Sequence, residues 1–235
     1  MKLELATKDY EKTLLPVRRA FKVADGDKRS AQLISAASKA IDAGRPDWEE
    51  VLTAVLAALI EDFGNEIAED LGGELKSIQP EEAKWVFDPM SAAVRAWIVK
   101  HGAESITTIL VTNLDDVKRI ILIGVDENLG TAKISRNLRQ FYIDRSPFKA
   151  MRVARTETSR AAGFGQREAA KQSGVVKTKK WLTSRDDRVR DEHVAMDGEE
   201  QPLDRAYSTG EMYPGEEAIM CRCAESYETR RQLDE

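Results

Sequence analysis

The side chains best suited to chemistry lie near the end of the 235-residue chain, at His193, Cys221 and Cys223. An imidazole and two thiols are ligands that zinc prefers, and Asp186 or Asp197 could supply a fourth. The spacing is a weak zinc signal, because a strong one contains paired C-x-x-C motifs and this chain has a single C-x-C. We therefore favour a hydrogen-bonded histidine beside two buried thiols, with no cofactor, and keep zinc as the alternative.

Two other kinds of chemistry are open to the same residues. A disulfide between Cys221 and Cys223 is disfavoured, since side chains two positions apart on a strand are separated by about 7 Å. His193 and one thiol form a conceivable base and nucleophile, oriented by Asp186 or Asp197. No nucleophile-turn glycine pattern flanks the cysteines, and the chain has neither a Walker loop nor a G-x-G-x-x-G motif. We predict that the protein is not an enzyme, and a metal- or cysteine/histidine-dependent enzyme is the alternative.

Two strands are expected to position these side chains. Residues 177–183 alternate in polarity around Trp181, which predicts a strand. Residues 218–227 predict a second strand, which carries both cysteines and pairs with the first. Between them, a capping-box pattern predicts a short helix over 184–194. In such a helix Asp186, Arg190 and His193 share one face.

A long helix is predicted directly before the first strand, over 146–173. Ser146 and Pro147 have the pattern of an N-cap followed by a first-turn proline, and Gly174 marks the end of the helix. The helix has a slim face of small residues. Gly163 and Gly165 are expected to be points of close packing rather than part of a phosphate-binding loop.

Further helices are predicted upstream, over 1–24, 30–43, 47–71, 88–102, 106–125 and 131–143. Asp88-Pro89 is the expected start of the fourth, and Gly72-Gly73 the expected stop of the third. The run 106–125 also fits two buried strands, but the charges in its middle favour a helix. The predicted fold is α+β, with a mainly α-helical part (1–123), a small C-terminal domain with a long helix, a short antiparallel sheet and loops (124–228), and a tail (229–235).

The overall composition is typical of a globular protein, with 42% hydrophobic and 33% charged residues. No run of about 18 apolar residues occurs, so we expect no transmembrane helix. Charges interrupt the N-terminal segment, which disfavours a signal peptide and makes a reducing cytoplasm the expected compartment.

The net charge of −5 conceals two blocks of opposite sign. Residues 148–190 contain 12 Lys or Arg against 4 Asp or Glu, whereas residues 191–235 contain 4 against 13. This pattern indicates either two different neighbours or one block that faces the other. A helix with a solvated basic face explains the basic block equally well.

A cluster of lysines at Lys177, Lys179 and Lys180, beside Trp181, could contact phosphate groups. Binding of that kind depends on salt and is independent of base sequence. No helix-turn-helix, zinc-finger or RNA-binding signature occurs, so we expect no base-specific recognition. A free-standing, non-specific DNA-binding module is therefore a further alternative.

The last third of the chain contains a series of short motifs in a fixed order. They are Ala154-Arg155-Thr156-Glu157, Trp181-Leu182-Thr183, Asp186, Arg190, His193, Asp197-Gly198, Pro214-Gly215 and Cys221-Arg222-Cys223. Over roughly 124–227, this series resembles the phage Mu F-like minor head protein family, also called phage head morphogenesis proteins. The first 120 residues carry no motif of the family and are similar to the variable helical leader of its members.

This resemblance implies a structural minor head protein of a tailed bacteriophage or prophage. Family members associate with the portal inside the head and assist head assembly and DNA packaging or ejection. The implied partners are the portal protein, other capsid or scaffold proteins and double-stranded DNA without sequence preference, but no membrane. The implied location is the virion, preceded by the host cytoplasm during assembly. Arg190, His193 and the Cys221-Arg222-Cys223 strand would then form a buried polar network that locks two strands and a short helix together.

Overall fold

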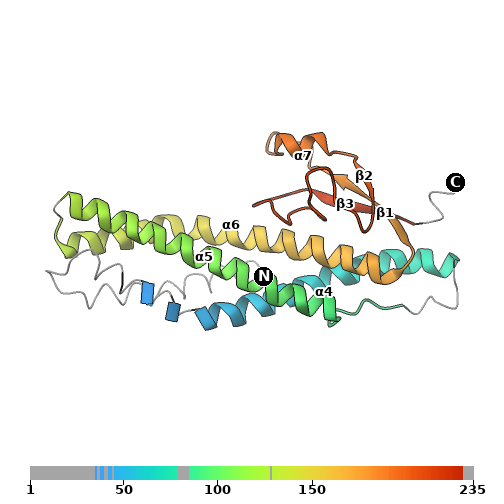
Figure 1. Ribbon diagram of the computed structural model, residues 1–235, viewed down its shortest axis with the longest axis horizontal. Coiled ribbons are helices and arrows are strands. Elements are labelled where there is room, and N and C mark those ends of the chain that lie inside the picture. Colours follow the sequence, from blue (N-terminus) through green and yellow to red (C-terminus); the bar gives the residue numbers. More distant parts are fainter. Residues whose placement is uncertain are drawn as a thin grey trace. The chain divides into compact units, whose positions relative to one another are not determined.

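A computed structural model describes residues 35, 38, 39, 42, 43, 45–78, 85–127 and 129–229 (Figure 1). The elements are α4 (Arg45–Ile78), α5 (Ala92–Asp126), α6 (Thr131–Ser173), β1 (Val176–Leu182), α7 (Asp191–Ala195), β2 (Glu200–Pro202) and β3 (Ala224–Thr229). Long helices followed by a small sheet confirm the predicted α+β class. The predicted helix 1–24, most of the predicted helix 30–43 and nearly all of the tail 229–235 lie outside the described residues.

The described chain forms two compact units. One contains the described residues up to Val55 together with Trp97–Ala154, and the other contains Leu56–Ala96 together with the described residues from Arg155 onward. Each of the helices α4, α5 and α6 contributes to both units. The predicted domain boundary between residues 123 and 124 falls in the last turn of α5, and it stays a prediction.

Two of the predicted helix breaks at glycine are wrong. α5 is one helix that continues through Gly102, and α4 continues past Gly72-Gly73 to Ile78. A glycine inside a helix costs only about 1 kcal/mol relative to alanine. In α5 the buried stripe resumes on the far side of Gly102 with Ile106 and Leu110, so burial outweighs that cost. The run 106–125 is therefore helical, as favoured from its charges.

The predicted break at Ser146-Pro147 is also wrong, because α6 is one helix from Thr131 to Ser173. Proline removes one helical hydrogen bond and costs about 3 kcal/mol in a helix interior. Buried residues hold the helix on both sides of this point, at Ile134, Leu138 and Ala154. The predicted end is correct, since Gly174 follows the helix with a left-handed φ of 70°.

The start of α5 differs from the predicted Asp88-Pro89 cap. Ser91 precedes the first helical residue, and its Oγ accepts a hydrogen bond from the Val94 N–H at 3.2 Å. Asp88 instead lies in the preceding turn, where its N–H donates to Gln172 Oε1 of α6 at 2.9 Å. This bond attaches the turn before α5 to the last part of α6.

β1 is the central strand of a three-stranded antiparallel sheet with the order β2-β1-β3 (Figure 1). It confirms the strand predicted over 177–183. A bulge between Val176 and Thr178 interrupts the regular alternation, so that Val176, Lys179 and Trp181 are all buried. The sheet therefore buries a lysine between two apolar side chains.

The second strand and the short helix are both displaced from their predicted positions. β3 pairs with β1 as expected, but it begins at Ala224, so Cys221 and Cys223 lie in the loop before it. Met220 has a φ of 60°, which interrupts an extended backbone directly before the first cysteine. α7 covers only Asp191–Ala195, and residues 184–190 form turns in which Arg185 has a φ of 52°.

The glycines of α6 are points of close approach, as predicted. A Cβ atom at Gly165 would lie 2.9 Å from the carbonyl oxygen of Ile60 in α4. A Cβ atom at Gly163 would lie 2.7 Å from the carbonyl oxygen of Pro214. Only glycine permits backbone contacts this close, so α6 can pack against α4 at one position and against the loop before the cysteines at the other.

Candidate functional site

His193 is a buried histidine on α7, with 2% of its surface exposed. Its ring packs edge-to-face against the indole of Trp181, with the ring centroids 5.1 Å apart. Trp181 is fully buried on β1 and makes a similar contact with Tyr207 at 5.0 Å. The aromatic contacts fix the plane of the imidazole and therefore the directions in which its two nitrogen atoms point.

One nitrogen of His193 faces both cysteines. Nδ1 lies 3.8 Å from Cys221 Sγ and 3.6 Å from Cys223 Sγ. The three ligand atoms all lie within 4.8 Å of one another. Cys221 is buried and Cys223 is half-buried, and neither is in a disulfide. The structure thus brings together the three residues that sequence analysis singled out.

The two neighbouring thiols have opposite pKa shifts. The pKa of Cys221 is lowered to about 6, chiefly by its interaction with Cys223. The interaction with Cys221, together with burial, raises the pKa of Cys223. Ionisation of one thiol disfavours ionisation of the other, which explains the opposite directions.

The other nitrogen of His193 faces a buried carboxylate. Nε2 lies 3.4 Å from Glu211 Oε2, and the Glu211 side chain is 6% exposed. The Glu217 N–H donates to the second carboxylate oxygen at 3.3 Å. A carboxylate at Nε2 favours the tautomer with the proton there, which leaves the Nδ1 lone pair directed at the sulfur atoms. Sequence analysis missed Glu211, because it lies in an irregular loop with no recognisable pattern.

The loop that carries Cys221 is held against α6 by hydrogen bonds. The Met220 N–H donates to Thr156 Oγ1 at 3.2 Å, and Ser159 Oγ donates to the Cys221 carbonyl oxygen at 3.1 Å. Arg160 Nε donates to the Gly215 carbonyl oxygen at 3.2 Å. These bonds explain why motifs on α6 and in the Pro214-Gly215 turn occur together with the cysteines.

The Pro214-Gly215 turn itself needs glycine. Gly215 has a φ of 86°, and a Cβ atom there would lie 2.8 Å from Ser159 Oγ. A second fixed point of this loop is Ile219, whose carbonyl oxygen accepts a hydrogen bond from Arg190 Nη2 at 2.6 Å. Arg190 therefore acts on the loop from the position before α7, and not from a helix face shared with His193.

The remaining charged motif residues lie around the cluster. On α6, Glu157 is buried and pairs with Arg160 at 3.2 Å, whereas Arg155 is exposed. Asp186 pairs with Arg222, and this hydrogen bond is the main reason why the pKa of Asp186 is lowered. Because Asp186 lies in a turn before α7, the predicted single face with Arg190 and His193 is wrong.

The Asp197-Gly198 turn closes the end of β1. Asp197 Oδ1 accepts hydrogen bonds from the Thr183 N–H at 2.9 Å and the Thr183 hydroxyl at 3.1 Å. The Gly198 N–H donates to the Trp181 carbonyl oxygen at 2.8 Å, with a φ of 86° at the glycine. These bonds occupy Asp197, and neither Asp186 nor Asp197 belongs to the group of ligand atoms around His193.

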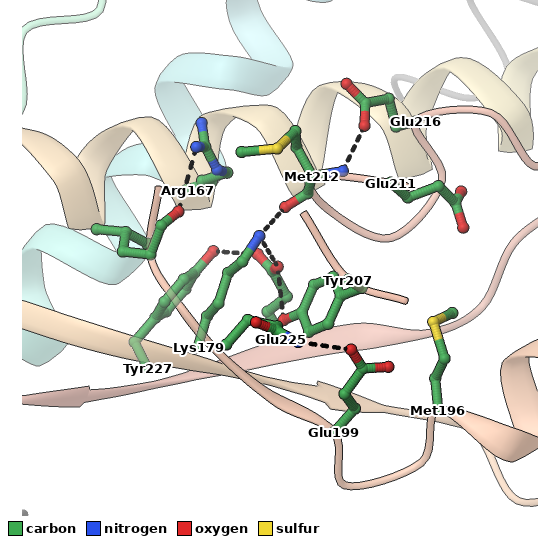
Figure 2. Close-up of polar contacts among 12 residues, drawn as sticks. Arg167, Lys179, Met196, Glu199, Tyr207, Glu211, Met212, Glu216, Glu225 and Tyr227 are labelled. Carbon is green, nitrogen blue, oxygen red and sulfur yellow. Dashed lines mark hydrogen bonds and ion pairs between the residues drawn. The ribbon is translucent and has the colours of Figure 1, made fainter. Parts of the chain in front are cut away.

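A second buried polar network lies on the same sheet, around Lys179 and Glu225 (Figure 2). The side chains are 0% and 1% exposed, and Lys179 Nζ lies 3.6 Å from Glu225 Oε1. Nζ also donates to the Met212 carbonyl oxygen and lies 4.3 Å from the ring centroid of Tyr207. The carboxylate accepts hydrogen bonds from Tyr207 at 2.9 Å and Tyr227 at 2.8 Å.

Burial opposes the charge on both members of this pair. Burial lowers the pKa of Lys179, and the attraction of Glu225 works against that shift. Burial raises the pKa of Glu225, and the attraction of Lys179 likewise opposes the shift. The pair can remain charged only because each partner, with its hydrogen bonds, offsets the desolvation of the other.

The three lysines considered for DNA contact are buried, half-buried or paired with glutamates. Lys179 is fully buried, which is incompatible with a phosphate contact. Lys180 pairs with Glu200 at 2.6 Å and with Glu228 at 3.6 Å. Lys177 is half-buried. The pairs of Lys179 and Lys180 join the basic block to the acidic block, as one of the two interpretations of the charge pattern expects.

The cluster has the donor set of a metal centre, with His193, Cys221 and Cys223 as the residues that could hold an ion. The same imidazole and thiol are close enough to act as a base and nucleophile after small movements. However, His193 is 2% exposed and Cys221 is 7% exposed, so little of either side chain is open to a substrate.

A long helix that supports a small antiparallel sheet, closed by a buried His–Cys–Cys cluster, defines an α+β module. Residues 115–226 match the family model described as phage Mu protein F like protein, so this region is similar to the phage Mu F-like family. The match includes His193, Glu211 and both cysteines, and it confirms the resemblance seen in the order of the motifs. No curated protein and no solved structure matches the chain significantly.

Proposed function

We propose that this chain is a minor head protein of a tailed bacteriophage or prophage that takes part in head morphogenesis. The observation that carries the proposal is the match to the phage Mu F-like family over residues 115–226. The matched region contains the whole His–Cys–Cys cluster and the part of α6 that supports it. No described helix is long and apolar enough to cross a membrane.

The finer proposal is association with the portal inside the head, together with other capsid or scaffold proteins. There the protein assists head assembly and the packaging or ejection of DNA, and its location is the virion after assembly in the host cytoplasm. The family resemblance supports this role. Any contact with double-stranded DNA is independent of sequence and uses basic residues that are exposed, such as Arg155 and Arg188.

In this role the buried groups hold a structure and perform no turnover. Thr156, Ser159 and Arg160 on α6 bind the loop before β3, and the His193 ring packs between that loop and Trp181. These contacts connect segments that are about 60 residues apart in sequence. A surface built on such connections has one fixed shape, which suits a protein that docks at a defined place in an assembly.

A co-assembly experiment tests the proposal. The chain is expressed with the portal, scaffold and major capsid proteins of its own genome, and its copies per purified particle are counted by mass spectrometry. The matched control omits only the portal. We expect a low, reproducible copy number that is lost in the control. Particles that lack the chain, while it remains in the supernatant, would refute the proposal. Incorporation that is independent of the portal would refute the portal contact alone.

A further inference from the structure

We propose that His193, Cys221 and Cys223 bind one zinc ion, through Nδ1 of the imidazole and the two sulfur atoms. The fourth position of the tetrahedral ion is open to water. The proposal rests on the geometry of these side chains, and it goes beyond the head morphogenesis role, which holds with or without a metal.

The spacing of the donor atoms fits a zinc ion. Zinc has Zn–S bonds of about 2.3 Å and Zn–N bonds of about 2.0–2.1 Å, so in a tetrahedral site bound nitrogen and sulfur atoms lie about 3.5–3.6 Å apart. The two distances from His193 Nδ1 to sulfur are 3.6 Å and 3.8 Å. The sulfur atoms lie within 4.8 Å of each other, and two sulfur ligands of such a site lie about 3.8 Å apart, so rotation of the thiol side chains is needed to place an ion between the three atoms.

The surroundings of the histidine provide a second, independent observation. Histidine ligands of metals commonly donate the N–H of the other ring nitrogen to a carboxylate, which orients the ring and makes the bound nitrogen more basic. Here Glu211 Oε2 lies 3.4 Å from Nε2, and Glu211 is itself buried. The Trp181 ring holds the imidazole from the side. A buried glutamate in this position suits a metal-bound histidine.

The backbone supports of the cluster hold the three ligands without help from the ion. α7 carries His193, and the hydrogen bonds from α6 fix the backbone at Cys221. Cys221 and Cys223 are two residues apart and lie on the same side of the imidazole, with both sulfur atoms facing Nδ1. The ligands are therefore preorganised, which reduces the entropy lost on binding.

The fourth position is assigned to water because no further His, Cys, Asp or Glu among the described residues brings a ligand atom within reach of all three. The group of His, Cys, Asp and Glu ligand atoms within mutual reach consists of these three residues. Cys223 is half-buried, so its side of the cluster is the one from which an ion and its water can enter. Each thiol releases its proton to solvent as its sulfur binds the ion.

The test is direct measurement of metal binding by the full chain. The protein is purified without a metal-affinity tag, kept reduced, stripped with a chelator and dialysed against zinc, and its metal content is determined by mass spectrometry. Cobalt(II) replaces zinc in a parallel sample, where sulfur-to-cobalt charge-transfer absorption reports thiolate ligands. The variants are Cys221→Ser, Cys223→Ser and His193→Gln. His101→Gln is the matched control, since His101 stacks on Trp97 and is not part of the cluster.

We expect one zinc ion per chain in the wild type and in His101→Gln, and a loss of binding in each ligand variant. Glu211→Gln is expected to retain the ion but to bind it about 10- to 100-fold more weakly in a chelator competition. Wild-type protein that binds no zinc, or cobalt bound without thiolate absorption, would overturn the proposal. The cobalt spectrum needs no variant, so it decides the question even if a ligand variant fails to fold. Equal zinc content in the wild type and in a folded Cys223→Ser variant would also overturn it.

Discussion

Lys179 and Glu225 are two charged side chains whose burial is unfavourable for each one alone. They contact each other on neighbouring strands, and the hydroxyl groups of Tyr207 and Tyr227 complete the coordination of the carboxylate (Figure 2). Breaking a buried pair leaves an uncompensated charge, which usually costs more than removing both partners. The core of this sheet therefore accepts each of these two charged residues only together with the other.

The first prediction concerns this pair. Lys179→Met and Glu225→Gln are each expected to lower the free energy of unfolding by about 3–5 kcal/mol. The double variant is expected to lose clearly less than the sum, because no charge is left unpaired. Urea unfolding at neutral pH, followed by circular dichroism, measures all three. Lys180→Met removes a partly exposed lysine from the opposite face of the strand and should have a much smaller effect. Strict additivity would show that the two charges are not coupled.

The second prediction concerns Asp197. Its pKa is lowered from 3.8, chiefly by the hydrogen bond from the Thr183 N–H. A lowered pKa in the folded state stabilises the protein above pH 3.8, and the contribution disappears as the pH falls through the folded-state pKa. Asp197→Asn keeps an acceptor oxygen but has no charge. We expect the wild type to melt at a higher temperature than this variant at neutral pH, and the gap to close in acid. A gap that does not vary with pH would contradict the prediction.

At the scale of elements, α6 organises the unit that contains the sheet. One part of this helix approaches the backbone of α4 at Gly165, and another binds the loop before β3 through Thr156, Ser159 and Arg160. Close helix packing and the positioning of the cysteine loop therefore depend on the same stretch of helix. A displacement of α6 should be transmitted to the His–Cys–Cys cluster.

The third prediction compares two helical glycines. Gly165→Ala would place a methyl group 2.9 Å from the Ile60 carbonyl oxygen, and we expect a loss of about 1–3 kcal/mol in stability from overpacking. Gly72→Ala meets no atom within 4 Å, so we expect no loss or a gain of up to about 1 kcal/mol from helix propensity. Thermal and urea unfolding measure both. Equal effects of the two substitutions would show that the close approach is not maintained.

At the scale of the whole molecule, the two charge blocks neutralise each other to a large extent. Lys179–Glu225, Lys180–Glu200 and Arg185–Asp197 each join a residue of the basic block to one of the acidic block. Residues of the two blocks therefore form ion pairs in the interior of the fold as well as on its surface. This reduces the positive charge that is available to DNA, and a docking role with other head proteins fits it better than a free-standing DNA-binding module.

The fourth prediction follows from the zinc proposal and concerns the stability of the folded chain. An ion that binds only the folded state raises the free energy of unfolding, by about 2.7 kcal/mol when its free concentration is 100 times the dissociation constant. We expect this effect in the transition of the unit that contains the cluster, measured by urea unfolding in zinc buffers. The Cys221→Ser/Cys223→Ser double variant should show no dependence on zinc. A wild type that is equally insensitive would contradict the prediction.

The sequence by itself determined the features that depend on neighbouring residues. Periodic apolar residues predicted the helices, alternation around Trp181 predicted β1, and Gly174 marked the end of α6. The residue types at His193, Cys221 and Cys223 identified the candidate site, and the order of motifs identified the family. Each of these signals depends on neighbouring residues or on the order and spacing of motifs along the chain.

Only the tertiary structure decided the features that depend on contacts between distant segments. α5 and α6 continue through Gly102 and Pro147 because burial on both sides exceeds the local penalty of about 1–3 kcal/mol. The strand predicted to carry the cysteines begins after them, since α6 binds the preceding loop. Lys179 was considered for phosphate contact, but it is buried against Glu225, which lies 46 positions away in sequence. Glu211 lies beside His193 only in the folded chain. No local pattern encodes such contacts, because their energy comes from residues that meet only in the folded chain.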